Sequence, residues 1–142
     1  MAISTESLWG ALPHLRDKIN TPKRILQEQA QILADATQHL LVGDVRATGQ
    51  GDSIIVSLNI VAPTLNNYRV NIVRVKHDAL AYPALVFNAL DSTDVHGTYC
   101  NDERALRQKL SEILGSEKVH TVVQSLLSQA SDEVVESSAE EE

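Results

Sequence analysis

The segment from Ser53 to Val61 constrains the fold most, because apolar side chains recur along it with a period of two residues. The alternating positions are Ile54, Val56, Leu58 and Ile60 on one side, and Ile55, Ser57, Asn59 and Val61 on the other. Successive side chains of a strand point to opposite faces of a sheet. The pattern therefore predicts a strand in a sheet that is covered mainly on one face.

Three further strands are predicted around this one. Val42–Thr48 pairs with Ser53–Val61 through the turn Gly49–Asp52. Tyr68–Lys76 changes its apolar phase midway, which indicates a β-bulge or a strongly twisted strand. Tyr82–Leu90 is apolar on both faces, with Pro83 at its beginning, as in a more buried strand. These strands form a four-stranded antiparallel meander, to which His96–Cys100 could add a short fifth strand.

Helices are predicted on both sides of this block. Thr21 and Pro22 form a good helix opening, and the apolar stripe that follows extends to Leu41, with Gly43 as the stop signal. A second helix begins at Asn101, and Gly115-Ser116 separates it from a third with helical apolar spacing. The expected fold is α+β: one helix, an antiparallel sheet of four or five strands in a meander, and an α-helical hairpin on one face.

Three regions are expected along the chain. Residues 1–20 form an amphipathic segment interrupted by Pro13, which either packs on the body or serves as a docking arm for a partner or second subunit. Residues 21–130 form the domain. Residues 131–142 carry six acidic side chains and no basic one, and we expect a disordered acidic tail that serves solubility, shields a surface of its own domain or imitates nucleic acid.

Charge and composition restrict the classes of partner. The net charge is −7, and most of it lies in the tail, so the body is nearly neutral and has no basic stripe for nucleic acid. Aromatic residues make up 4% of the chain, too few for a base-stacking platform. The single cysteine, the lack of a signal peptide and the lack of a long apolar run predict a cytoplasmic protein without membrane contact. No cofactor is expected.

The turn between the second and third strands supplies the first set of candidate binding residues. Asn66 and Asn67 favour a structural turn, but Leu65 and Tyr68 flank them as an apolar pair suited to recognition. Arg69, Arg74 and Lys76 follow on the next strand, and by strict alternation the last two share a face with Tyr68. A small cationic patch for an anionic ligand is one interpretation.

The polar loop from Asp91 to Glu103 supplies the second set, Asp94 and His96, near Cys100. One histidine and one cysteine at this spacing match none of the usual zinc arrangements, so no metal site is predicted. His96-Gly97-Thr98 is a single H-x-T unit, and a two-histidine phosphoesterase needs a second. Cys100 as a nucleophile would need an oxyanion loop that the sequence does not present. No catalytic residue is predicted here.

The open face of the sheet leads to the functional hypothesis. Strict alternation places Ile55, Val61, Val73 and Val75 on it, and an exposed apolar sheet face is typical of an interface. We expect a non-catalytic binding protein of the chaperone, inhibitor, immunity or adaptor type, whose partner is another protein or a second copy in a homodimer. The alternatives are a small-molecule or nucleotide-binding domain and a small enzyme using residues 94–103.

The small acidic α+β composition resembles that of type III secretion chaperones. That family interrupts its sheet with a helix, whereas this sequence continues directly from strand to strand. The resemblance implies a chaperone role but transfers no motif or site residue.

Overall fold

The computed structural model describes residues 6–140, with side chains as far as Val134. The strands are β1 (Val42–Gln50), β2 (Ser53–Ala62), β3 (Tyr68–His77), β4 (Ala84–Asn88) and β5 (Thr98–Cys100). The helices are α1 (Pro22–Ala36), α2 (Glu103–Leu114) and α3 (Glu117–Glu140), with 3-10 turns η1 (Leu15–Asp17) and η2 (Pro63–Leu65). The strands form one antiparallel sheet in meander order, which confirms the predicted α+β class and its fifth strand.

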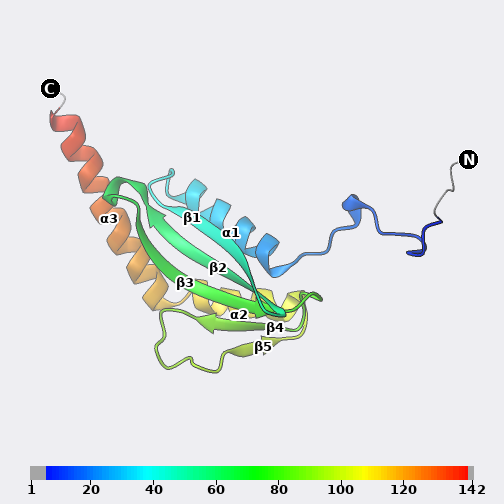
Figure 1. The fold of residues 1–142 in the computed structure, drawn as a ribbon. Helices are drawn as coiled ribbons and strands as arrows, with labels where there is room; N and C mark the ends of the chain where they lie inside the picture. Colours follow the sequence, from blue (N-terminus) through cyan, green and yellow to red (C-terminus); the bar gives the residue numbers. More distant parts are fainter. Residues whose placement is uncertain (1–5, 141–142) are drawn as a thin grey trace, which may run out of the picture.

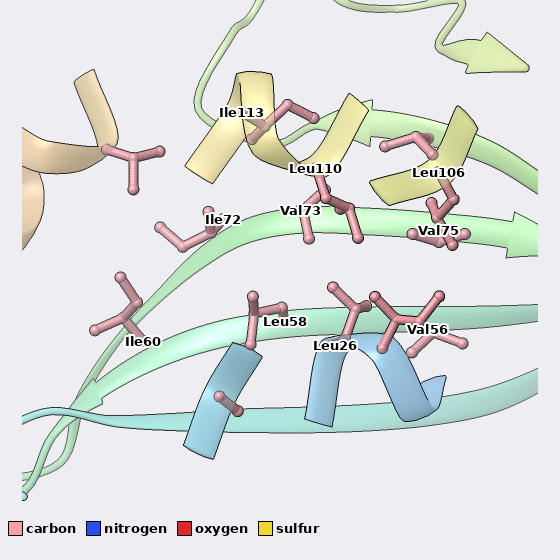
Figure 2. Close-up of a cluster of buried hydrophobic side chains, with 14 of the residues drawn as sticks. Leu26, Val56, Leu58, Ile60, Ile72, Val73, Val75, Leu106, Leu110 and Ile113 are labelled. Carbon is pink, nitrogen blue, oxygen red and sulfur yellow. The ribbon is translucent and has the colours of Figure 1, made fainter. Parts of the chain in front are cut away.

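The helices cover one face of the sheet (Figure 1). α1 packs on β1 and β2, α2 packs on β4 and β5, and α3 packs against η2. Side chains from both layers meet in one core, where Leu26 of α1 lies by Val56 and Leu58, and Leu110 of α2 lies by Val73 (Figure 2). The face turned away from the helices is called the open face here. Ile55 and Val61 lie on it, as predicted, together with Asp44, Arg46, Ser57, Asn59, Arg69, Asn71, Arg74 and Lys76.

α1 begins as the sequence predicts but ends earlier. The Thr21 hydroxyl accepts a hydrogen bond from the backbone N–H of Arg24 at 3.3 Å, and Pro22 occupies the first turn. At the other end the Thr37 hydroxyl donates to the carbonyl of Leu41 at 2.9 Å and accepts from its N–H. Because Thr37 captures these backbone groups, the helix stops at Ala36 rather than Leu41.

Gly43 has a packing role instead of the predicted role as a helix stop. It lies in β1, where an added Cβ would come within 2.4 Å of the Ala30 Cβ on α1. We expect Gly43→Ala to lower the free energy of unfolding by about 1–3 kcal/mol, since α1 must move off β1. Urea denaturation measures this, with Gly49→Ala in the same strand as the control, because nothing lies within 4 Å of its added Cβ. Equal costs for the two variants would contradict the close contact.

The phase change in β3 is a β-bulge, as predicted, and it overturns the expected distribution of apolar residues. Leu58 pairs with Val73 and Asn59 with Asn71, so Ile72 is the extra residue between them. The bulge reverses the alternation after Ile72. Val73 and Val75 are fully buried on the helix side, and the expectation that they lie on the open face is wrong.

The two C-terminal helices begin at side-chain caps. The Asp102 carboxylate accepts from the N–H of Ala105 at 2.8 Å, one residue later than the predicted start, and the Ser116 hydroxyl accepts from the N–H of Val119 at 3.3 Å. α3 then continues to Glu140, so residues 131–140 are helical where a disordered tail was expected. None of the helices within residues 6–140 is both long and apolar enough to span a bilayer.

The N-terminal segment leaves the body as an extended arm, defined here as residues 6–19 (Figure 1). Its large apolar side chains are exposed: Leu8, Trp9, Leu12, Leu15 and Ile19. The alternative in which this stripe packs on the body is therefore wrong for the arm. Residues 1–5 and 141–142, the outer ends of the predicted segment and tail, lie outside the described residues.

Candidate functional site: a cationic hollow on the open sheet face

The open face is hollowed over β1, β2 and β3. The hollow has a volume of about 610 Å³ and is called the arginine hollow here. It is lined by Arg46, Thr48, Gly49, Gln50, Ile55, Ser57, Asn59, Arg69, Asn71 and Arg74. Three guanidinium groups, three amides and two hydroxyls line the hollow, and Ile55 is the one large apolar side chain among them. The hollow is therefore a cationic surface rich in polar groups.

Cross-strand pairing brings these side chains together from distant positions. Arg46 lies opposite Ser57, and Ser57 lies opposite Arg74, so one row crosses the sheet with a hydroxyl between two guanidinium groups. The neighbouring row consists of Asp44, Asn59 and Asn71. The turn after Gln50 sets the register between β1 and β2, and the bulge at Ile72 sets the register between β2 and β3. Both the turn and the bulge are therefore needed to build the hollow.

Asp44 is the counter-ion of the hollow. Its carboxylate accepts from the guanidinium of Arg69 and, at 2.8 Å, from that of Arg46. The hydrogen bond from Arg69 and the positive charge of Arg46 hold the pKa of the Asp44 carboxyl below its ordinary value. A lowered carboxyl pKa contributes to stability above about pH 4, and this contribution is lost as the pH falls through the lowered pKa.

Arg74 and Lys76 are the other two cations of the open face. Neither forms an ion pair with a carboxylate among the residues whose side chains are described. The Arg74 guanidinium lies 5.9 Å from the centroid of the Phe87 ring, opposite it on β4. Lys76 is exposed one row further along the sheet. This surface therefore carries four basic side chains and one carboxylate, although the whole chain has a net charge of −7.

The floor of the hollow is held by an amide pair. Asn59 is 7% exposed, and its side-chain oxygen accepts from the amide of Asn71 at 3.0 Å. The same Asn71 nitrogen lies 3.3 Å from the carbonyl oxygen of Leu58 at the bulge. These contacts fix the backbone at the register shift, and so they fix the direction in which Arg74 leaves the strand.

The structure divides the predicted turn residues between the two faces. Asn66 and Asn67 adopt left-handed backbone conformations that close the turn after η2, which is the structural role the sequence favours. Leu65 and Tyr68 line a separate groove against α3, together with Val70 and Leu126. Because of the bulge, Arg74 shares a face with Arg69, and the expectation that it shares a face with Tyr68 is wrong.

The loop between β4 and α2 does not assemble a catalytic pair. The Asp94 carboxylate accepts from the N–H of Asn88 at 2.8 Å and from that of Gly97 at 3.1 Å, so it fixes the loop. His96 is exposed, whereas Cys100 is 2% exposed in the core. Burial raises the pKa of the Cys100 thiol, which disfavours the thiolate that a nucleophile needs.

A second polar cluster lies where the chain enters α1. The Asn20 amide donates to the Glu103 carboxylate, and the Tyr82 hydroxyl donates to the Asn20 carbonyl at 2.7 Å. Arg107 pairs with Glu103 at 2.8 Å and with Glu28 at 3.2 Å. These bonds join α1, the connection that precedes β4, and α2, and they anchor Asn20, the residue from which the arm extends.

Metal ligands do not gather elsewhere in the described part of the chain: no three His, Cys, Asp or Glu side chains are close enough to hold an ion. In the arginine hollow, positive charge, polar side chains and concavity coincide. Comparison with models of known families, with curated proteins and with solved structures finds no significant match.

Proposed function

We propose that the chain is a non-catalytic binding protein whose arginine hollow takes an acidic segment of a partner protein. The observation that carries the proposal is the convergence of Arg46, Arg69 and Arg74 on one hollow whose described lining contains no carboxylate, with Asp44 as the ion-pair partner of two of them. Guanidinium groups bind carboxylates through paired, charge-assisted hydrogen bonds, which gives both affinity and orientation.

The spacing of the cations suits a peptide. Arg46 and Arg74 lie two strand separations apart, about 10 Å between their Cα atoms, and Arg69 lies further along β3. Carboxylates on alternate residues of an extended chain lie about 7 Å apart, so a short acidic segment can meet two of the arginines while its backbone crosses the sheet. The partly exposed Ser57 hydroxyl in the hollow can bond the peptide backbone.

The chain as a whole disfavours a long polyanion. A net charge of −7 repels nucleic acid at distances beyond the hollow. A single nucleotide or another small anion is the second candidate, supported by the same three arginines. A partner acting through the arm is compatible with both, since the arm and the hollow are separate surfaces.

A binding titration tests the proposal. A fluorescein-labelled Glu-Ser repeat peptide, followed by anisotropy, is expected to bind saturably and to weaken as salt rises from about 0.01 M to about 1 M, because screening shortens the range of the charges. The Gln-Ser repeat of equal length is the control and is expected not to bind. Equal affinity for the two peptides would contradict the proposal, and tighter binding of a nucleotide than of the acidic peptide would favour the second candidate.

Removal of the Asp44 carboxylate is expected to strengthen peptide binding rather than weaken it. Asp44→Asn is expected to tighten binding of the Glu-Ser peptide by about two- to fivefold, because it frees Arg46 and Arg69 at a partly exposed site. Asp35→Asn makes the same change in net charge on α1 and is the control, with little effect expected. Weaker binding by Asp44→Asn would show that Asp44 is needed to position the arginines.

A further inference from the structure

The C-terminal end of α3 is a second charged surface, opposite in sign to the hollow. Residues 131–142 contribute six carboxylates and no basic side chain, and positions 132, 136 and 140 follow each other at the four-residue spacing that lies along one side of a helix. The last turn of α3 contains no basic residue. Acidic groups repel each other at this spacing and oppose the negative end of the helix dipole, so this helix end is electrostatically unfavourable on its own.

The body of the same chain does not stabilise this helix end by packing. Leu126 and Ala130 are buried, but residues 131–134 are all exposed. Figure 1 shows the end of α3 extending past the sheet at the connection between β2 and β3. A cationic surface in another molecule would offset both the repulsion and the dipole.

The arginine hollow of the same chain is on the wrong side for this contact. α3 packs on the helix side through Val119, Leu126 and η2, whereas the hollow opens on the opposite face. An intact α3 therefore carries its acidic end away from the hollow of its own chain. The hollow of a second copy can approach this acidic end, because its position is not fixed relative to α3 of the first copy.

We infer that residues 131–142, which comprise the acidic end of α3 as far as Glu140 and the last two residues of the sequence, bind in the arginine hollow of a second copy. The inference rests on the proposed function, because it uses the same hollow, and it names this chain as one source of the acidic segment. Two copies that exchange their helix ends reciprocally form a closed twofold dimer, with each hollow filled by the other copy's carboxylates. An acidic partner then competes with the helix end, so self-association and partner binding exclude each other.

Sedimentation of the full-length chain and three variants tests the inference. The tail variant is Asp132→Asn, Glu133→Gln and Glu136→Gln. The hollow variant is Arg69→Gln and Arg74→Gln. The matched control is Glu6→Gln, Asp35→Asn and Glu112→Gln, which removes the same number of carboxylates, all three of them exposed, at sites away from the hollow. The unchanged chain and the control are expected to form dimers at about 0.01 M salt and monomers at about 1 M.

The two other variants are expected to be monomers when each is alone, and to associate when they are mixed. The mixture restores one contact, because the tail variant supplies an intact hollow and the hollow variant supplies an intact helix end. A monomeric full-length chain at low salt, or a mixture that stays monomeric, would overturn the inference.

The peptide titration separates this inference from the proposed function. The tail variant is expected to bind the Glu-Ser peptide more tightly than the unchanged chain, since its helix end has lost three of its six carboxylates and competes less for the hollow. Peptide binding of equal strength in both, together with a monomeric full-length chain, would remove the inference and leave the proposed function standing. Failure of the tail variant to bind the peptide would remove both.

Discussion

Ile72→Ala is expected to lower the free energy of unfolding by about 2–5 kcal/mol, the largest stability effect of the substitutions considered. Ile72 is the extra residue of the bulge in β3, and its side chain is fully buried between the sheet and the helices. Truncation leaves a cavity at the point where the strand changes phase. Urea denaturation measures the effect.

Ile32→Ala is the control for Ile72, because it removes the same atoms from a side chain that is 58% exposed on α1. Its expected cost is within about 0.5 kcal/mol. If the two variants lost equal stability, the bulge residue would not be part of the core. The explanation for the direction of Arg74 would then fail as well.

Arg69→Glu together with Arg74→Glu is expected to weaken binding of the Glu-Ser peptide more than about a hundredfold. Each substitution removes a charge-assisted contact of about 1.5 kcal/mol or more, and each adds a carboxylate that repels the peptide. Stability is expected to change little, because Arg74 is exposed and Arg69 makes a partly exposed ion pair. Anisotropy gives the affinity, and urea denaturation verifies the fold.

Arg24→Glu together with Arg104→Glu is the matched control for this charge reversal. Both arginines are exposed on the helix side, on α1 and α2, and the substitutions change the net charge by the same amount. The control should lose only the part of the affinity that depends on overall charge. A similar loss in the two double variants would mean that the hollow has no specific role.

The fold could be predicted because its local signals agree with one another. Alternation in Ser53–Ala62, the cap at Thr21 and the Gly115-Ser116 break each specify an element, and these elements pack as the α+β class requires. The predictions are wrong where a tertiary contact, rather than the local sequence, determines the end of an element or the role of a residue. Thr37 ends α1 early through its bonds to Leu41, and Gly43 is required for packing against Ala30.

The candidate site could be predicted only in part. Arg69 and Arg74 stand out in the sequence as cations on one strand, but strict alternation assigns them to different faces. The bulge places them together, and its exact position depends on the pairing of Leu58 with Val73. A phase change alone does not show which residue is extra.

Arg46, Ser57, Asn59 and Asn71 were not identified as site residues from the sequence. One signal was present: Ser57 and Asn59 are polar positions on the less apolar side of the β2 segment. Arg46 could not be identified in this way, because its place in the site depends on pairing between strands. Arg46 lies opposite Ser57 only because the turn at Gly51 and Asp52 fixes the register. Ile55 and Val61 lie on this face as expected, but Arg74 and Lys76 lie there in place of Val73 and Val75, so the surface is cationic.

The most direct test of the central claim is an amide NMR titration of the full chain with the Glu-Ser peptide. We predict saturable shifts at Arg46, Ser57, Asn71 and Arg74, which lie on three different strands, with a common dissociation constant that rises with salt. Shifts confined to the arm or the helix side, or no shifts at low salt, would contradict binding of acidic segments in the arginine hollow.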